Sequence, residues 1–488
     1  MDKNIIKNSP FTGSEAGGRA EEHKKQELFV PLNAQALTLQ HCDTTSIIEV
    51  WRNDTLRLDH TAEDKRALLK INDATLKLTN MENHRRRCLY FKTGRIDTSW
   101  WTAWARRTED GYKEVYKTLG SRNYHEACRR ISESWKSFQE LMEAKKEGRL
   151  PDWLEPHPPS TKKDHMEIVV RSDEYEVDDE NKILYLRFGT RDKRTILAIP
   201  YRGELRWLKN ATTKGRLIIS FDDLEECFYA SVASKVKINA AVPRTVHYAG
   251  VDIGIRILAA TAITNGQALL YKGGPLLSTY HRFEEKLSML DKRLSTETDE
   301  DALRELKKRR KGLYRRLKRR RRQTFANVAL HLARELRDCN ANVVFIGLPK
   351  DIVRDKPYKE VVSLWSYNEF LKRLAYTLEN FNIALYGVSE KNTSKVCPVC
   401  GEKAERVNRG TLLCPKGHLT HSDVAGAANI LARGLQALGI NVSMPHYFHF
   451  KTFFPGPDGI REPRHSSDLA TDISDSQRRN NCQKNYFF

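Results

Sequence analysis

The spacing of hydrophobic residues divides the N-terminal half of the chain into blocks of different texture. Residues 46–155 carry apolar positions three and four residues apart, which predicts a helical domain. Residues 160–243 alternate apolar and polar positions in short runs separated by turn residues, which predicts a small β-barrel or sandwich. Residues 1–45 are polar and irregular, so we expect a flexible N-terminal segment there.

From residue 246 onward, strand-like and helix-like patterns alternate, which predicts an α/β domain. Its first part spans 246–390 and its second part 423–440, with a cysteine-rich insert at 391–422 and a polar tail at 441–488. The fold class we expect is therefore a multidomain α+β protein. The expected elements are three strands within 247–269, helices at about 278–295 and 299–338, a strand at 341–347, a helix at about 366–380, a strand at 383–388 and a final helix.

Composition narrows the class of protein. Forty per cent of the 488 residues are hydrophobic, which is enough to bury several cores. No apolar run approaches the roughly 18 residues of a membrane span, and the first residues lack the apolar core of a secretory signal, so we expect neither a membrane protein nor a secreted one. Six of the nine cysteines stand singly, a pattern typical of a reducing compartment and not of a disulfide framework.

The net charge of +20 points to a polyanionic partner, and much of it lies in one segment. Residues 307–322 contain twelve Lys or Arg residues and no acid, on a helix whose leucines form a narrow apolar seam. A solvated charge run or a nuclear-localisation-like tract is the alternative to a nucleic-acid contact surface. We expect nucleic-acid contacts, because such a helix repels itself unless a polyanion neutralises it. The candidate residues are Lys307, Lys308, Arg309, Arg310, Lys311, Arg315, Arg316, Lys318, Arg319, Arg320, Arg321 and Arg322.

A second group interleaves basic and aromatic side chains in the helical block. Residues 84–87 read His-Arg-Arg-Arg, and three tryptophans follow at 100, 101 and 104. The group could contact phosphates and stack on bases, or the tryptophans could form the core of a small helical domain.

The cysteine-rich insert has the spacing of a zinc site. Cys397 and Cys400 form a C-x-x-C knuckle, and thirteen residues separate Cys400 from Cys414. The fourth ligand position of a second C-x-x-C pair is occupied by glycine, so we assign His418, with His421 as the alternative. Small zinc ribbons are structural, and we assign the metal no catalytic role.

Two aspartates are candidates for metal-dependent chemistry. Asp252 ends an apolar strand, where a lone acid is costly to bury unless it is paired or binds a metal. Asp423 begins the final helix, where an aspartate could also serve only as a helix cap.

Residues from about 246 to 437 resemble the RuvC-type nuclease domain of the TnpB family, whose relatives include the compact type V CRISPR effectors and the eukaryotic Fanzor proteins. The matching pieces cover about two fifths of the chain in the same order: VDIG at 251–254, the long basic helix, VVFIGL at 343–348, TSKVCPVCG at 393–401 and HSDVAGAANI at 421–430. The blocks upstream fit the family's recognition and wedge domains by position and texture. The resemblance implies an RNase H-like (RuvC) fold with an inserted zinc ribbon, residues 391–422, that binds the target nucleic acid.

The resemblance also implies a guide-RNA-directed DNA endonuclease in which three carboxylates hold two Mg²⁺ ions. Asp252 and Asp423 match two of those ligands, but the usual glutamate at the end of VVFIGL is replaced by Gly347. Either the site is broken, or the acid has moved to Glu390, at the end of the next strand, as in some TnpB and Fanzor-like proteins. Asp351 is a less favoured substitute. We assign Asp252, Glu390 and Asp423.

Two other functions remain open at this point: a cleavage-dead, guide-directed DNA-binding protein, motivated by Gly347, and a RuvC-like resolvase or transposition factor without a guide. The resemblance implies a guide RNA and a double-stranded DNA target as partners, no membrane, and a monomer on its RNA. The expected location is the cytoplasm or nucleoid of a prokaryote, or the nucleus for a Fanzor protein.

Overall fold

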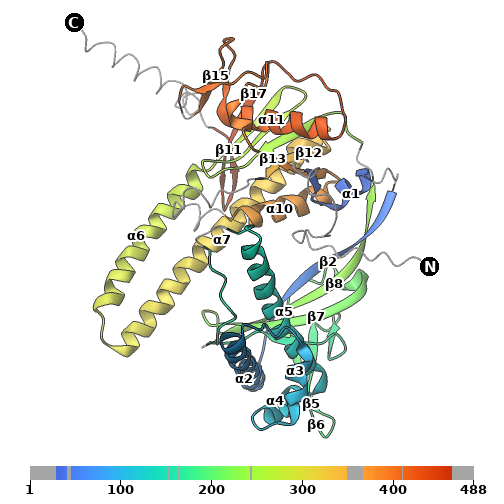
Figure 1. Ribbon diagram of the computed structural model, residues 1–488, viewed down its shortest axis with the longest axis vertical. Helices are drawn as coiled ribbons and strands as arrows, with labels where there is room; N and C mark the ends of the chain where they lie inside the picture. The colour runs from blue at the N-terminus through green and yellow to red at the C-terminus, as the bar shows by residue number, and fades with distance from the viewer. Residues whose placement is uncertain are drawn as a thin grey trace. The chain divides into compact units, whose positions relative to one another are not determined.

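The computed structural model describes residues 29–40, 45–150, 154–162, 164–241, 244–348, 366–408 and 410–463 (Figure 1). The chain divides into two compact units. One unit comprises Ile47–Ile238, and the other combines Met1–Ser46 with Asn239–Phe488. Within the described ranges, no helix combines the length and the apolar character that a membrane crossing requires.

The unit Ile47–Ile238 joins helices and a seven-stranded sheet around one hydrophobic core. Trp135 from a helix and Phe228 from a strand are both fully buried in that core. The expected helical and β blocks therefore share a core. The strand order is β3-β7-β8-β2-β6-β5-β4. The strands are β2 (Thr45–Leu58), β3 (Ile168–Val170), β4 (Tyr175–Asp178), β5 (Ile183–Thr190), β6 (Lys193–Arg202), β7 (Ala211–Asp222) and β8 (Cys227–Ala241). The helices are α2 (Ala62–Thr93), α3 (Trp100–Ala105), α4 (Tyr112–Leu119) and α5 (Ser121–Lys146).

The prediction that the helical block begins at residue 46 is wrong, because β2 occupies the first part of that block. Asp54, Leu56 and Leu58 are buried while Asn53, Thr55 and Arg57 between them are exposed, which is the alternation of a strand. The carboxylate of Asp54 accepts hydrogen bonds from the backbone N–H groups of residues 206–208 at 3.0–3.1 Å. Asp54 therefore stabilises the loop at residues 206–208, and the segment that contains it is a strand and not a helix.

The second unit contains an eight-stranded mixed sheet of order β1-β13-β12-β9-β10-β11-β17-β18. Its central strands β9, β12 and β13 are parallel, and β10 is antiparallel to β9. The elements expected from residue 246 onward are confirmed with shifts of a few residues at their ends. The strands are β9 (Tyr248–Asp252), β10 (Ile257–Ile263), β11 (Gln267–Lys272), β12 (Val343–Leu348) and β13 (Ala384–Ser389). The helices are α6 (Gly274–Thr296), α7 (Glu300–Asp338), α10 (Tyr367–Asn380) and α11 (Ser422–Ala437).

Helices cover both faces of this sheet. Alternate residues of β12 point to opposite sides: Val344 and Ile346 pack with the cores of α7 and α10, whereas Val343 and Phe345 pack with α11. Such a strand is apolar throughout, as expected for a parallel strand that is covered on both faces.

Small residues in α11 let it approach the sheet closely. A Cβ atom added to Gly250 of β9 would stand 2.1 Å from the carbonyl oxygen of Ala427. A Cβ on Gly434 of α11 would stand 2.1 Å from the ring of Phe345. The run of alanines and glycines after Asp423 therefore brings the start of α11 onto the end of β9.

The predictions of an irregular N-terminal segment and a C-terminal tail are wrong for the parts the structure describes. β1 (Phe29–Pro31) pairs with β13, and α1 (Ala34–Gln40) follows it. β17 (His449–Gly456) pairs with β11, and β18 (Gly459–Arg461) pairs with β17. β1 and β17 join the sheet through pairing with distant segments, which no local pattern reveals. Residues 1–28 and 464–488 of the two predicted segments lie outside the described residues.

Candidate active site

The strand register brings the ends of three parallel strands to one edge of the sheet. Val251 of β9 pairs with Ile346 of β12, so Asp252, the last residue of β9, lies beside Gly347, the next-to-last residue of β12. Gly347 in turn pairs with Val388 of β13, and Glu390 comes directly after Ser389, the last residue of that strand. Neighbouring strands lie about 4.8 Å apart, so side chains at these ends can reach one another.

The carboxylate of Glu390 lies in the space that a side chain at position 347 would fill. A Cβ atom added to Gly347 would stand 3.2 Å from the Oε2 atom of Glu390 and 2.7 Å from the Cδ1 atom of Ile430. The glycine on β12 thus leaves room for an acid supplied by the neighbouring strand.

Asp252 faces the first turns of α11. A Cβ atom on Gly426 would stand 2.5 Å from the Oδ2 atom of Asp252, so only glycine fits there. Asp423 lies three residues earlier on the same helix, which is about one turn. His421 caps the helix: its Nδ1 atom accepts the backbone N–H of Asp423 at 3.3 Å, and it lies 3.9 Å from the Oδ2 atom of Asp423.

The electrostatics show that these carboxylates influence one another. Burial and the charges of Asp423 and Glu390 raise the pKa of Asp252 to about 8, although Arg406 lowers it in part. Burial raises the pKa of Glu390 to about 7. Acids whose charges act on one another at one half-buried edge repel each other, and a divalent cation with oxygen ligands relieves such repulsion. The donor set therefore fits Mg²⁺.

Three residues that sequence reasoning missed support this edge. The hydroxyl of Tyr367, at the start of α10, donates to the carbonyl oxygen of Gly347 at 2.6 Å. The side-chain amide of Asn429 donates to the carbonyl oxygens of Thr393 and Val396, at 2.7 and 2.8 Å, and so ties α11 to the insert. Arg406 is on β14 (Glu405–Arg406) of the insert. No local pattern marks Tyr367 or Arg406, whereas Asn429 belongs to the HSDVAGAANI run. Asp351 lies outside the described residues.

The insert brings four metal-binding side chains together. The ligand atoms of Cys397, Cys400, Cys414 and His418 all lie within 4.8 Å of one another. His418 Nδ1 is 3.2 Å from Cys414 Sγ, while His421 is engaged at the cap of α11. Burial raises the pKa of Cys414, but hydrogen bonds from the backbone of His418 and Lys416 and from the other thiols outweigh it and lower the pKa to about 7. Thiolates are the zinc-binding form of cysteine, so this donor set fits a tetrahedral Zn²⁺.

The basic segment lies on α7, as expected, but part of its charge is used inside the chain. Arg309 pairs with Glu305 at 3.1 Å, and Arg310 pairs with Asp291 of α6 at 2.8 Å. Arg321 and Arg322 both pair with Glu369 of α10, the former at 2.6 Å. The sequence prediction treated all twelve cations as one surface, and it missed these pairs because their acids come from other turns and helices. Exposed cations of the segment include Lys307, Arg316, Lys318, Arg319 and Arg320.

The basic and aromatic group in the helical block divides into two kinds of residue. Arg86 is fully buried and pairs with buried Glu82, and Arg85 also pairs with Glu82, at 2.8 Å. Those arginines hold the helices together. Trp100 and Trp101 are 36% and 57% exposed, so of the three tryptophans these two are accessible for contact with a nucleic acid.

A mixed sheet with acids at its edge and a cysteine–histidine insert before the last helix defines a protein of the TnpB and compact type V effector superfamily. Residues 231–353 match the family model described as "Probable transposase", and residues 367–430 match "Cas12f1-like, TNB domain". The chain is 30% identical over 425 residues to the TnpB-like protein ORF457 of Acidianus two-tailed virus, covering 81% of this chain and 90% of that protein. The chain belongs to the TnpB family.

A chain of a solved structure shares this fold at low sequence identity. A chain of the cryo-EM structure of the Cas12f1-sgRNA-target DNA complex matches with a TM-score of 0.51 at 13% identity, over 79% of this chain and 98% of that chain. A chain of the structure of the mini-RNA-guided endonuclease CRISPR-Cas_phi3 matches with a TM-score of 0.41 at 11% identity, over 84% and 95% of the two chains.

Proposed function

We propose that this protein is an RNA-guided DNA endonuclease whose Asp252, Glu390 and Asp423 hold two Mg²⁺ ions. The observation that carries the proposal is the position of Glu390: its carboxylate lies beside Gly347, in the space where a side chain of β12 would project, and its charge acts on Asp252. Two half-buried acids side by side make each other more costly to ionise, so their pairing is expected where a metal ion binds both and unexpected in a broken site.

Each acid has a distinct place in the proposed site. Asp252 ends the central strand β9, and the charges of both other acids act on it, so it would be one of the metal ligands. Glu390 would approach from β13, and Asp423 from α11, where its side chain is 29% exposed and open to a substrate. When bound, the two Mg²⁺ ions would supply an activated water and a stabilised leaving 3′ oxygen for phosphodiester hydrolysis.

The insert is proposed to bind one structural Zn²⁺ through Cys397, Cys400, Cys414 and His418. The support is the clustering of the four ligand atoms within 4.8 Å. The side-chain amide of Asn429 on α11 donates hydrogen bonds to two backbone carbonyl oxygens at the start of this insert. A folded insert would therefore help to fix the helix that carries Asp423, which links zinc binding to the geometry of the carboxylates.

The proposed partners are a guide RNA and a double-stranded DNA target, with the protein monomeric on its RNA. Pairing with the guide would read the target sequence, while the protein would grip backbones and a short flanking motif. The exposed cations of α7 suit that role. The similarity of fold to a chain of a Cas12f1-sgRNA-target DNA complex supports it. The helical and β blocks upstream would serve as recognition and wedge domains.

The test is to sequence the RNA that co-purifies with the protein and to supply DNA that matches it, next to a randomised flank. We expect a discrete RNA and Mg²⁺-dependent cutting of matched DNA only. Matched DNA that is bound and left uncut would support a cleavage-dead binder instead. Cutting without co-purified RNA would support a resolvase or another guide-free nuclease.

A further inference from the structure

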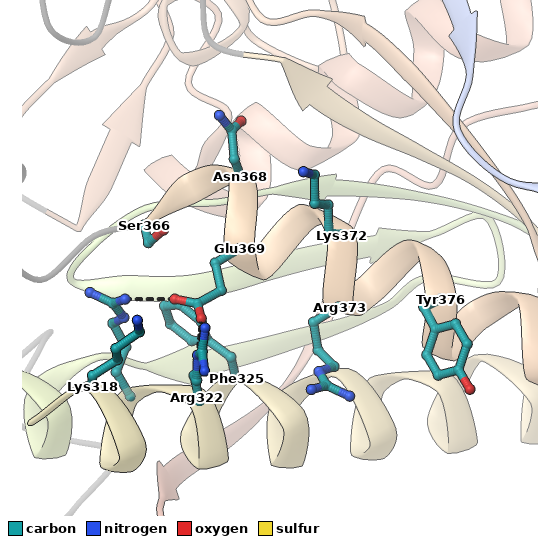
Figure 2. Close-up of a pocket in the computed structure, with 10 residues that line it drawn as sticks. Lys318, Arg322, Phe325, Ser366, Asn368, Glu369, Lys372, Arg373 and Tyr376 are labelled. Carbon is teal, nitrogen blue, oxygen red and sulfur yellow. Dashed lines mark hydrogen bonds and ion pairs between the residues drawn. The ribbon is translucent and has the colours of Figure 1, made fainter. Parts of the chain in front are cut away.

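A groove of about 740 Å³ lies between α7 and α10, outside the carboxylate edge (Figure 2). Phe325 of α7 packs against Phe370 of α10, with ring centroids 5.2 Å apart, and this contact holds the two helices together beneath the groove. Five cationic side chains and one carboxylate line it, together with two aromatic and two neutral polar residues. The cations are Lys318, Arg321 and Arg322 of α7 and Lys372 and Arg373 of α10, and the carboxylate is that of Glu369.

Glu369 fixes two of the cations in place. Its carboxylate accepts hydrogen bonds from Arg322 and from Arg321 Nη2, the latter at 2.6 Å. Figure 2 shows Glu369 of α10 reaching toward Arg322 of α7. Burial alone would raise the pKa of Glu369, but the hydrogen bonds and charges of the two arginines lower it below its usual value. The acid therefore stays ionised and orients the arginines, and the groove keeps a clear positive excess.

The side chains of α10 extend this charge along the groove. Lys372 and Arg373 are exposed, and Tyr376 follows one turn later. The sequence prediction named no residue of α10 as a nucleic-acid contact. The structure adds a second helix with its own cations and an aromatic ring, which is the combination that holds a nucleic-acid strand by its phosphates and bases.

The groove also lies next to the carboxylate edge. Ser366 lines one end of the groove, and the next residue, Tyr367, donates a hydrogen bond to the carbonyl oxygen of Gly347. From Tyr367 to Tyr376 the helix rises about 14 Å at 1.5 Å per residue. That length corresponds to roughly four nucleotide steps at about 3.4 Å each along a strand.

We propose that the α7–α10 groove binds the phosphodiester backbone of a nucleic-acid strand beside the carboxylate edge. This inference rests on the proposed function only for its position next to the site of cutting. The chemistry is the same for a DNA strand that is being cut and for a segment of guide RNA, and the experiment below separates these two sources.

The test compares the full-length chain with the double variant Lys372→Gln/Arg373→Gln. The matched control is Lys286→Gln/Lys292→Gln, which removes the same charge from exposed positions on α6, away from the groove. The probes are labelled single-stranded DNA and RNA of the same sequence, about 12 nucleotides long. Binding is measured over a series of salt concentrations in EDTA, so that no strand is cut.

We expect the groove variant to reduce the slope of log K against log salt by about 1.4, at roughly 0.7 per lost phosphate contact. At about 0.15 M salt that corresponds to roughly tenfold weaker binding. A larger loss on DNA would assign the groove to the cut strand, and a larger loss on RNA would assign it to the guide. Equal losses in the groove and control variants, or unchanged binding by the groove variant, would overturn the proposal.

This binding test does not depend on catalysis. If the wild-type chain binds the strands through the groove yet cuts no matched DNA in Mg²⁺, then the groove stands and the nuclease proposal fails. If the chain cuts matched DNA and the groove variant binds and cuts as the wild type does, then the nuclease stands and the groove fails.

Discussion

Glu390 and Gly347 share one space at the edge of the sheet: a Cβ atom on the glycine would stand 3.2 Å from the Oε2 atom of the glutamate. Gly347 is on β12 and Glu390 directly follows β13, the neighbouring parallel strand, and the register brings these two strand ends together. A carboxylate after β13 can therefore lie close to the point that a side chain at position 347 would reach.

A methyl group at position 347 should disturb the acid. In Gly347→Ala, the new Cβ would approach Ile430 to 2.7 Å and Glu390 to 3.2 Å, so one or both side chains must shift. We expect a loss of about 1–3 kcal/mol in unfolding free energy and a larger loss in cleavage than in guide binding. Denaturant unfolding and single-turnover cleavage measure the two effects. A fully active variant would show that Glu390 does not need this space. Gly274→Ala, whose Cβ has open space, is the control.

Replacing Asp252 should stabilise the metal-free protein. Because the pKa of Asp252 is raised to about 8 in the fold, the folded state binds more protons than the unfolded state between about pH 4 and pH 8, and stability falls as pH rises through that window. Asp252→Asn removes this cost, so its advantage over the wild type should be small near pH 4 and grow to at most about 5 kcal/mol near pH 8. Thermal unfolding in EDTA across this pH range measures it.

Magnesium should reverse that order. The wild type should gain stability on addition of Mg²⁺, and Asp252→Asn should gain little, because the variant lacks the carboxylate that we propose as a ligand. Equal gains in both proteins would contradict a role for Asp252 as a ligand.

The insert should distinguish its two histidines. His418→Ala should lose Zn²⁺, because Nδ1 of His418 lies beside Cys414 and Cys397, at 3.2 and 3.6 Å. His421→Ala should keep Zn²⁺ but lower cleavage by about 10–100-fold, because His421 caps the helix that carries Asp423. Metal analysis and cleavage rates measure the two effects. Zinc loss in His421→Ala with retention in His418→Ala would reverse the ligand assignment.

The pairs of Glu369 should contribute to stability. Glu369→Gln leaves Arg321, whose side chain is only 14% exposed, without its carboxylate partner. We expect a loss of about 1–3 kcal/mol in unfolding free energy. Glu305→Gln breaks only the exposed pair with Arg309 and should cost less than about 0.5 kcal/mol. Similar costs for both variants would contradict the structural role of Glu369.

Much of the second unit could be predicted from its sequence, because its strands and helices carry strong local patterns. β12 is apolar throughout, α7 has a seam of leucines, and the insert has a C-x-x-C knuckle. The grouping of Glu390 with Asp252 is implied by the resemblance to the TnpB family and by no local pattern of hydrophobic residues.

The rest depends on contacts between distant segments. β1 and β17 join the sheet only through partners more than 170 residues away in the sequence. Their polar surroundings therefore predict a flexible N-terminal segment for the first and a tail for the second. In β2 a polar residue, Asp54, takes one of the buried positions, so apolar and polar residues do not alternate as in an ordinary strand. Tyr367 and Glu369 acquire their roles only when α10 packs near Gly347 and α7, which no spacing within α10 reveals.

The most direct test of the account is the cleavage of guide-matched DNA in Mg²⁺ by the wild type and by Glu390→Gln, each with its co-purified RNA. Glutamine keeps the shape of the side chain and removes its charge. We predict that the variant binds RNA and matched DNA as the wild type does and cuts at least about 100-fold more slowly. Cutting at the wild-type rate by Glu390→Gln would contradict the assignment of Glu390 as the third carboxylate of the site.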